Sequence, residues 1–286
     1  MVSLTGKRRR AVAIEFDPGY ARRPYSGLVA SYPAEEAYPA NAFRLEWGPV
    51  FHRGRLDGSA RVLVIGQDPA THEAICRRIL VGEAGQRVQG FLARLGITHA
   101  YVMVNALLYS VYGQQAGNRH IADEGVAAYR NRWLDALVER NELDAIVTLG
   151  GLAHRAYEMW RETPAGAAST AAYANIIHPT FPESASRSGD ISRAAAMAIL
   201  TRSWNAALDL LHPVVRQEVP TPLVHYGSRL QRTDTVEIPA CDLPAGLPAW
   251  MRSLDAWAAR RGTGAEEKRA TLHVVVPRRA RTWVRR

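Results

Sequence analysis

The sequence predicts an α/β fold: a three-layer α/β/α sandwich around a central, mostly parallel four-stranded sheet, followed by a C-terminal extension. Short apolar runs alternate along the chain with segments whose apolar residues have helical spacing. That alternation is typical of a parallel sheet with helices on both faces. The chain has 286 residues, of which 47% are hydrophobic, and this is enough to bury one large core.

Four apolar runs are the expected strands, at residues 61–65, 101–104, 144–149 and 173–177. Helices are expected at residues 71–78, 85–95, 123–139 and 191–211, with a further helix after Gly151 that ends at Trp160. Gly96 follows the second of these and is a typical helix stop. The glycine-containing stretch 113–118 and the small-residue stretch 163–170 are expected to be a loop and a linker.

This pattern divides the chain into three parts. Residues 1–60, interrupted by prolines, are expected to form an irregular or helical segment packed on the core, which spans residues 61–212. Residues 213–286 form a basic C-terminal extension that ends in an arginine-rich run. Within it we expect short strands at residues 223–226, 236–238 and 272–276, and a helix at residues 247–261.

The charge favours a polyanionic partner. The chain has 36 Lys and Arg against 27 Asp and Glu, a formal net charge of +9, and a basic surface attracts nucleic acid. A genome biased toward arginine codons is the alternative explanation. The two cysteines, Cys76 and Cys241, are too few for a four-cysteine zinc or iron–sulfur site, so we expect small buried residues and no metal or cofactor. No run approaches the roughly 18 apolar residues of a membrane span, and no secretion signal is evident, so a cytoplasmic protein is expected.

Polar side chains follow three of the four expected strands. Gln67 and Asp68 come after the first strand, Asn105 after the second and His178 after the fourth. Ligands of such sheets bind beyond the carboxyl ends of the strands, so we expect these residues to converge. Breaking a nucleoside C–N bond places positive charge on the sugar and negative charge on the base. A carboxylate stabilises the positive charge on the sugar, and a histidine stabilises the negative charge on the base. An asparagine offers a hydrogen-bond donor and an acceptor to the base edge.

The same segments resemble the motifs of a known family. Gly66-Gln-Asp-Pro69 resembles the first motif of the uracil-DNA glycosylase superfamily in its classical form, and the His-Pro turn that begins at His178 is similar to the second. Residues 104–108 resemble the strand end whose asparagine contacts the base, and residues 80–85 resemble a segment of the iron–sulfur branch. The resemblance covers residues 61–212.

The resemblance implies a role for each matching residue. Asp68 would orient the attacking water, and His178, as a neutral imidazole, would hold the negative charge on the base. Gln67 and Asn105 would contact the base. Taken singly, each polar residue has a structural alternative: Asp68 as the start of a turn, Asn105 as a loop cap and His178 as a core histidine.

The sequence departs from the family pattern at two base-binding positions. Ala70 stands where the classical branch has a tyrosine that excludes thymine, and Leu80 stands where the iron–sulfur branch has a stacking aromatic residue. Nearby side chains that are candidates for excluding thymine instead are Tyr109, Tyr112 and Ile75.

The expected DNA contacts follow the His-Pro turn. Phe181 or Pro182 would fill the space that the flipped base leaves, although Phe181 as a core residue is the alternative. Phosphate contacts are expected from residues just after this turn, which are Ser184, Ser186, Arg187 and Ser188; a flexible polar loop is the alternative. Arg119 and His120 are expected to contact phosphate or to cap the next helix.

The sequence thus predicts a monomeric, monofunctional DNA repair glycosylase of base excision repair, associated with the nucleoid, that flips uracil out of single- or double-stranded DNA and leaves an abasic site. Alternatives are another deaminated base (hypoxanthine or xanthine), a member that binds uracil-DNA covalently through His120, a non-catalytic DNA-binding module, and a small-molecule hydrolase.

Overall fold

The computed structural model describes residues 16–33, 37–189, 191–252 and 256–280, and its centre is a five-stranded sheet in the order β1-β3-β2-β4-β5. The strands are β1 (His52–Gly54), β2 (Val62–Gly66), β3 (Tyr101–Asn105), β4 (Ala145–Leu149) and β5 (Ala172–Ile176). The four predicted strands are all present, and all pair in parallel. The predicted count is one too low, because β1 adds an antiparallel edge strand beside β3.

The central strands are buried on both faces, which explains their continuous apolar runs. In β2, Val62 and Val64 belong to the core on one side of the sheet, and Leu63 and Ile65 belong to the core on the other. β1 carries no such run, since its residues are His, Arg and Gly, and hydrophobic patterning therefore cannot detect it.

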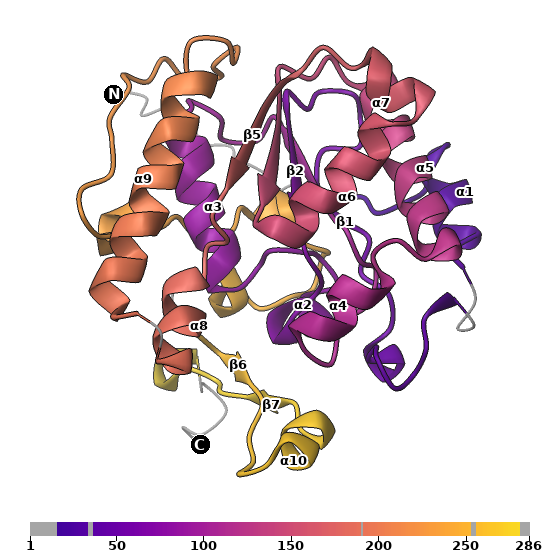
Figure 1. Ribbon diagram of the computed structural model, residues 1–286, viewed down its shortest axis with the longest axis vertical. Coiled ribbons are helices and arrows are strands. Elements are labelled where there is room, and N and C mark those ends of the chain that lie inside the picture. Colours follow the sequence, from indigo (N-terminus) through magenta and orange to yellow (C-terminus); the bar gives the residue numbers. More distant parts are fainter. Residues whose placement is uncertain (1–15, 34–36, 190, 253–255, 281–286) are drawn as a thin grey trace, which may run out of the picture.

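Helices cover both faces of the sheet, which confirms the predicted three layers (Figure 1). On one face lie α3 (Glu83–Arg94) and α9 (Arg193–Leu211), whose Phe91 and Trp204 rings meet edge to face. On the other lie α1 (Tyr25–Ala30), α5 (Glu124–Arg140) and α6 (Gly151–Arg161). None of the helices among the described residues is long and apolar enough to cross a membrane.

Four short helices complete the core: α2 (Thr71–Cys76), α4 (Gln114–His120), α7 (Pro164–Ala168) and α8 (Phe181–Ser188). The predictions of a loop at residues 113–118 and a linker at residues 163–170 were wrong, because α4 and α7 occupy them. α7 begins with local signals that the small residues obscured: the Thr163 side chain accepts a hydrogen bond from the Gly166 amide, and Pro164 occupies the first turn.

The C-terminal extension is mostly irregular. Three expected elements are absent from its described residues: 223–226 and 236–238 are not strands, and the expected helix at 247–261 is not formed by 247–252 or 256–261, while 253–255 lie outside the described residues. Instead, Ala249–Arg252 is a 3₁₀ turn, and β6 (Ala258–Ala259) pairs with β7 (His273–Val274) around α10 (Ala265–Ala270). The expected strand at residues 272–276 thus contains β7. The end of the basic run, residues 281–286, lies outside the described residues.

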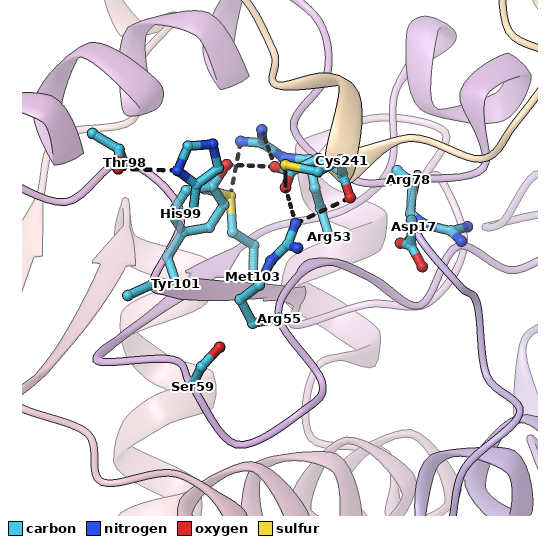
Figure 2. A network of polar contacts seen from close by, with 12 residues as sticks. Asp17, Arg53, Arg55, Ser59, Arg78, Thr98, His99, Tyr101, Met103 and Cys241 are labelled. Carbon is cyan, nitrogen blue, oxygen red and sulfur yellow. Dashed lines mark hydrogen bonds and ion pairs between the residues drawn. The ribbon is translucent and has the colours of Figure 1, made fainter. Parts of the chain in front are cut away.

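A buried carboxylate attaches the extension to the edge of the sheet. Asp242 is 0% exposed, and its Oδ2 accepts a hydrogen bond at 3.0 Å from Arg53, which is also 0% exposed. Its Oδ1 accepts one at 2.6 Å from Arg55, and the Tyr101 hydroxyl also donates to Oδ2. Figure 2 shows these arginine and tyrosine side chains gathered beside Cys241. Because Arg53 lies in β1 and Arg55 directly follows it, this edge strand and the extension stabilise each other.

Asp242→Asn is expected to lower the free energy of unfolding by about 3–5 kcal/mol, because it leaves the buried Arg53 charge without its counter-ion. Urea unfolding followed by circular dichroism measures this. Glu237→Gln, at an exposed position of the same extension, is the control and should change stability little. Equal stability of the two variants would contradict the anchoring role.

Candidate active site at the carboxyl edge of the sheet

A cavity of about 600 Å³ opens at the carboxyl ends of the parallel strands. β3 and β4 lie on opposite sides of β2, so the direction of strand order changes here, which is where ligands of such sheets bind. The residues that line it come from the ends of β2, β4 and β5 and from α2, α3 and α8; they are Gln67, Asp68, Ala70, His72, Glu73, Leu80, Gly82, Glu83, Ala84, Gly150, Gly151, Ile177, His178, Thr180, Phe181 and Ser184.

Asp68 lies directly beyond β2 with its carboxylate held by the loop after β3. The Val111 amide donates a hydrogen bond to Asp68 Oδ2 at 3.1 Å. Burial raises the pKa of Asp68 to about 6, although hydrogen bonds from Val111 and Gln67 oppose the shift. Asp68 is therefore ionised at neutral pH, with a carboxylate less well solvated than one on the surface.

His178 follows β5 and lines the same cavity as Asp68. The Thr180 amide donates to His178 Nδ1 at 3.3 Å, and the Thr180 hydroxyl lies 3.1 Å from the same nitrogen. An Nδ1 that accepts carries no proton, so the neutral ring has its proton on Nε2. Burial, and then the Arg87 charge, lower the pKa of His178 to about 4. The ring is thus a neutral hydrogen-bond donor at physiological pH.

Arg87 on α3 positions the turn that carries His178. Its guanidinium donates to the Pro179 carbonyl and to both carboxylate oxygens of Glu183, at 2.9 and 3.0 Å, and it also pairs with Glu83. Sequence reasoning missed this residue. The spacing of Glu83 and Arg87 by four residues was a visible signal of a helix pair, but the contact with residues 179–183 is tertiary.

Asn105 lies beside the cavity and is not among the described residues that line it. Its Oδ1 covers Gly66, where an added β-carbon would lie 2.3 Å away, and the Leu80 side chain is the next neighbour. Asn105 also borders a separate small hollow of about 20 Å³ with Tyr38 and Trp133. Asp68 and His178 therefore share one cavity, and Asn105 adjoins Gly66 at its edge without being among the described lining residues.

The other predicted base-binding residues, Gln67, Ala70 and Leu80, all line the cavity. Leu80 is buried and has a φ of 53°, a conformation unusual for leucine, and Gly85 packs so closely on its carbonyl that a β-carbon would lie 1.4 Å from the oxygen. Ala70 is exposed at the mouth. The candidates for excluding thymine pack elsewhere: Tyr109 against Tyr38 and Tyr112 against Arg44, while Ile75 contacts the small core around Trp257.

The segment after the His-Pro turn is a helix, so the alternative of a flexible polar loop is not what the structure shows. α8 begins at Phe181 with Pro182 in its first turn, where a missing amide hydrogen does no harm. Phe181 and Ser184 line the cavity, whereas Pro182 is buried and so is not placed to fill the space of a flipped base. Ser186 is half-buried and Arg187 is exposed further along α8; the Ser188 side chain lies outside the description.

Arg119 and His120 lie apart from this cavity. They line a different hollow, of about 350 Å³, with Pro39, Asn41, Ala42 and Ala116. His120 Nδ1 is 2.6 Å from the carboxylate of Asp123, which occupies the N-cap position of α5 without a side-chain capping hydrogen bond.

Two further lining residues went unnoticed in the sequence. The buried Glu73 accepts hydrogen bonds at 3.2 Å from the Ala70 and Val81 amides, which fixes the loop around Leu80, and His72 stands against Gly82. Among the described residues, no group of three or more His, Cys, Asp or Glu side chains is placed to hold a metal ion. Cys76 is buried and Cys241 half-buried, and neither forms a disulfide.

Comparison with protein-family models identifies the family. The model of the uracil DNA glycosylase superfamily matches residues 53–215, more than half of the chain. The chain belongs to the uracil-DNA glycosylase superfamily. A search of curated proteins finds no match. Membership of this superfamily supports the role of a DNA glycosylase, a hydrolase of base excision repair that acts on DNA. The matched residues begin within β1 and end just beyond α9, so they include nearly all of the five-stranded sheet and leave out residues 216–286 of the extension.

Asp68→Asn is expected to stabilise this glycosylase at neutral pH. Since the pKa of Asp68 rises from 3.8 to about 6 on folding, ionisation opposes folding, and removing the charge should add up to about 3 kcal/mol above pH 6. The gain should shrink between pH 6 and 4 and vanish below pH 4, where the group is protonated in both states. Unfolding at pH 4, 5, 6 and 8 measures the difference; a gain that is constant with pH would argue against the shifted pKa.

Proposed function

We propose that the protein hydrolyses the N-glycosidic bond of uracil in DNA, using water as the nucleophile, and leaves an abasic site. The observation that carries the proposal is that Asp68 and His178 line the same cavity, Asp68 as an anion and His178 as a neutral hydrogen-bond donor. These are the states that glycosidic cleavage requires at the sugar and at the base.

The reaction begins with the base extrahelical in the cavity, because its C1′ atom is otherwise inaccessible in the duplex. As the C1′–N1 bond breaks, its electron pair leaves with the base and positive charge develops on the sugar. The Asp68 carboxylate stabilises that charge and orients a water molecule, whose oxygen bonds to C1′ and whose proton passes to Asp68. The His178 Nε2–H donates to the base oxygen on which negative charge gathers, and the base leaves as neutral uracil after taking up a proton.

Two placements favour hydrolysis by water over the alternatives. No lysine is among the described side chains that line the cavity, so the site offers no amine for a Schiff base, and the proposed enzyme is monofunctional. His120, the alternative covalent nucleophile, lines a different hollow. The shared cavity of Asp68 and His178 favours catalysis over a purely binding role.

A second substrate class is favoured by Ala70. This residue is exposed and lines the cavity at the position where the classical branch carries a tyrosine, which leaves room for a larger deaminated base such as hypoxanthine or xanthine. A panel of oligonucleotides with uracil, hypoxanthine, xanthine or thymine, single- and double-stranded and cleaved at abasic sites after incubation, separates these substrates. We expect uracil to be excised fastest; no excision of any of the four bases would contradict the proposal.

The kcat/KM for uracil excision should rise with pH through about 6 and then level off, since Asp68 must lose its proton while His178 is already neutral above about pH 4. Asp68→Asn should lower excision by about 10²–10⁴-fold and abolish this pH dependence, with DNA affinity largely retained. Rates between pH 5 and 8 and fluorescence anisotropy measure both effects. A wild-type rate from the variant would remove Asp68 from the mechanism.

His178→Ala should lower kcat by about 10²–10³-fold, the effect of removing one donor to a developing oxyanion. The matched control is His225→Ala, which removes an exposed histidine of the extension and should excise uracil normally. Single-turnover rates with excess enzyme separate this chemical effect from binding. Equal rates for the two variants would show that His178 does not contact the departing base.

A further inference from the structure

The C-terminal arm, defined here as residues 256–280, lies outside the matched family region and yet is seated on the catalytic core. Its Trp257 is 1% exposed and packs with Cys76, Val81, Ile238 and Leu243 in a small separate core, and β6 packs against α2. In Figure 1 the arm, drawn in yellow, extends beyond α2 and α8. The arm is therefore a fixed part of the molecule on the side where the cavity opens.

The arm contacts the catalytic core at two places near the cavity. The Ala258 amide donates to His72 Nε2 at 3.3 Å, and His72 lines the cavity. Further along, the Arg269 carbonyl accepts a hydrogen bond from Arg44 at 3.0 Å, and the Arg269 guanidinium lies 4.5 Å from the centre of the Tyr112 ring. Tyr112 follows Val111, whose amide donates to Asp68. The arm thus contacts both α2 and the loop that binds the Asp68 carboxylate.

The arm carries an excess of exposed positive charge. Its exposed cationic side chains are Arg260, Arg261, Lys268, Arg269 and Arg278, against only two acidic residues. One of the two, Glu267, accepts hydrogen bonds from the Thr263 amide at 2.6 Å and hydroxyl at 2.9 Å, so it closes the turn before α10. The charge on this surface is therefore available to a polyanion.

Two arginines meet at one aromatic ring where the arm contacts this loop. Arg44 and Arg269 each lie 4.5 Å from the centre of the Tyr112 ring. Arg44 is almost fully buried, its Nε has no hydrogen-bond partner, and its carboxylate neighbour Glu46 is 3.8 Å away. The exposed Arg260 directly follows β6, which packs against α2, so a third positive charge lies on the same side of the core. Like charges repel one another, and a bound anion relieves that repulsion.

We propose that the C-terminal arm binds the sugar-phosphate backbone of the DNA strand that carries the flipped base, with Arg260 and Arg269 as its phosphate-contacting residues. This inference rests on the proposed function, since it requires that the base in the cavity comes from DNA. Guanidinium groups beside the mouth suit phosphates that flank an extrahelical nucleotide. The arm then contributes affinity for DNA and positions the strand on the protein, while Asp68 and His178 act on the glycosidic bond.

The test is the salt dependence of DNA binding by the full-length chain. The probe is a fluorescent duplex with a stable abasic-site analogue, titrated by anisotropy at several salt concentrations. Each lost phosphate contact lowers the slope of log K against log[salt] by about 0.9, so Arg260→Ala/Arg269→Ala should lower it by about 2. Arg44 would keep its partner, because the Arg269 carbonyl remains.

Two matched variants make the result specific. Arg140→Ala/Arg202→Ala removes the same charge from two exposed positions and should retain the wild-type slope. Arg140 is the last residue of α5, which leads to the amino edge of the sheet, and Arg202 lies in α9. Arg260→Lys/Arg269→Lys keeps the charge and should restore most of the slope. An equal fall in slope for both alanine pairs would mean a general charge effect and would overturn the proposal.

The outcomes separate the arm from the chemistry. If the wild type excises uracil and Arg260→Ala/Arg269→Ala binds DNA with an unchanged slope, the arm proposal fails alone, and an acidic protein becomes the better candidate for its partner. If the slope falls as expected while the wild type excises none of the four bases, the proposed function fails and the arm remains a DNA-binding element.

Discussion

The parallel pairing of β2 with β3 and β4 is the constraint on which the site depends. It aligns the strands so that Gly66 is opposite Asn105, and it brings the residues beyond β2, β4 and β5 to one edge. Two glycines allow the close approach: Gly66 leaves space for the Asn105 side chain, and Gly150, with a φ of 85°, lies against the β-carbon of His178. Without this alignment, Asp68 and His178 would be polar residues at unrelated strand ends.

Burial acts on the two central residues in opposite directions. It disfavours the charged form of both groups, so the pKa of the Asp68 carboxyl rises and that of the His178 imidazole falls. Both pKa values stay below 7. At physiological pH the cavity therefore holds the Asp68 anion and a neutral His178 donor together. Arg87 contributes to both position and charge at His178, because it holds the following turn and disfavours protonation of the ring.

The extension depends on a second buried interaction at the opposite edge of the sheet from β5. Asp242 takes hydrogen bonds from Arg53 in β1, from Arg55 just after it and from Tyr101, and Trp257 and Ala258 are buried beside α2. A segment with few regular elements is thereby fixed against the core. The Asp242 contact comes before the basic arm, and the burial of Trp257 holds the start of the arm against α2.

The sequence by itself determined the four parallel strands, the helices on both faces and the position of Asp68 and His178 at strand ends. This was possible because parallel strands that are buried on both faces have continuous apolar sequences. Patterning could not reveal β1, whose buried His52 and Arg53 are stabilised by partners distant in the chain. Nor could it reveal that Asn105 lies over Gly66, that residues 181–188 form α8, or that Thr180 fixes the His178 tautomer. Tertiary structure decided these features, because each depends on contacts between segments whose spacing along the chain carries no period.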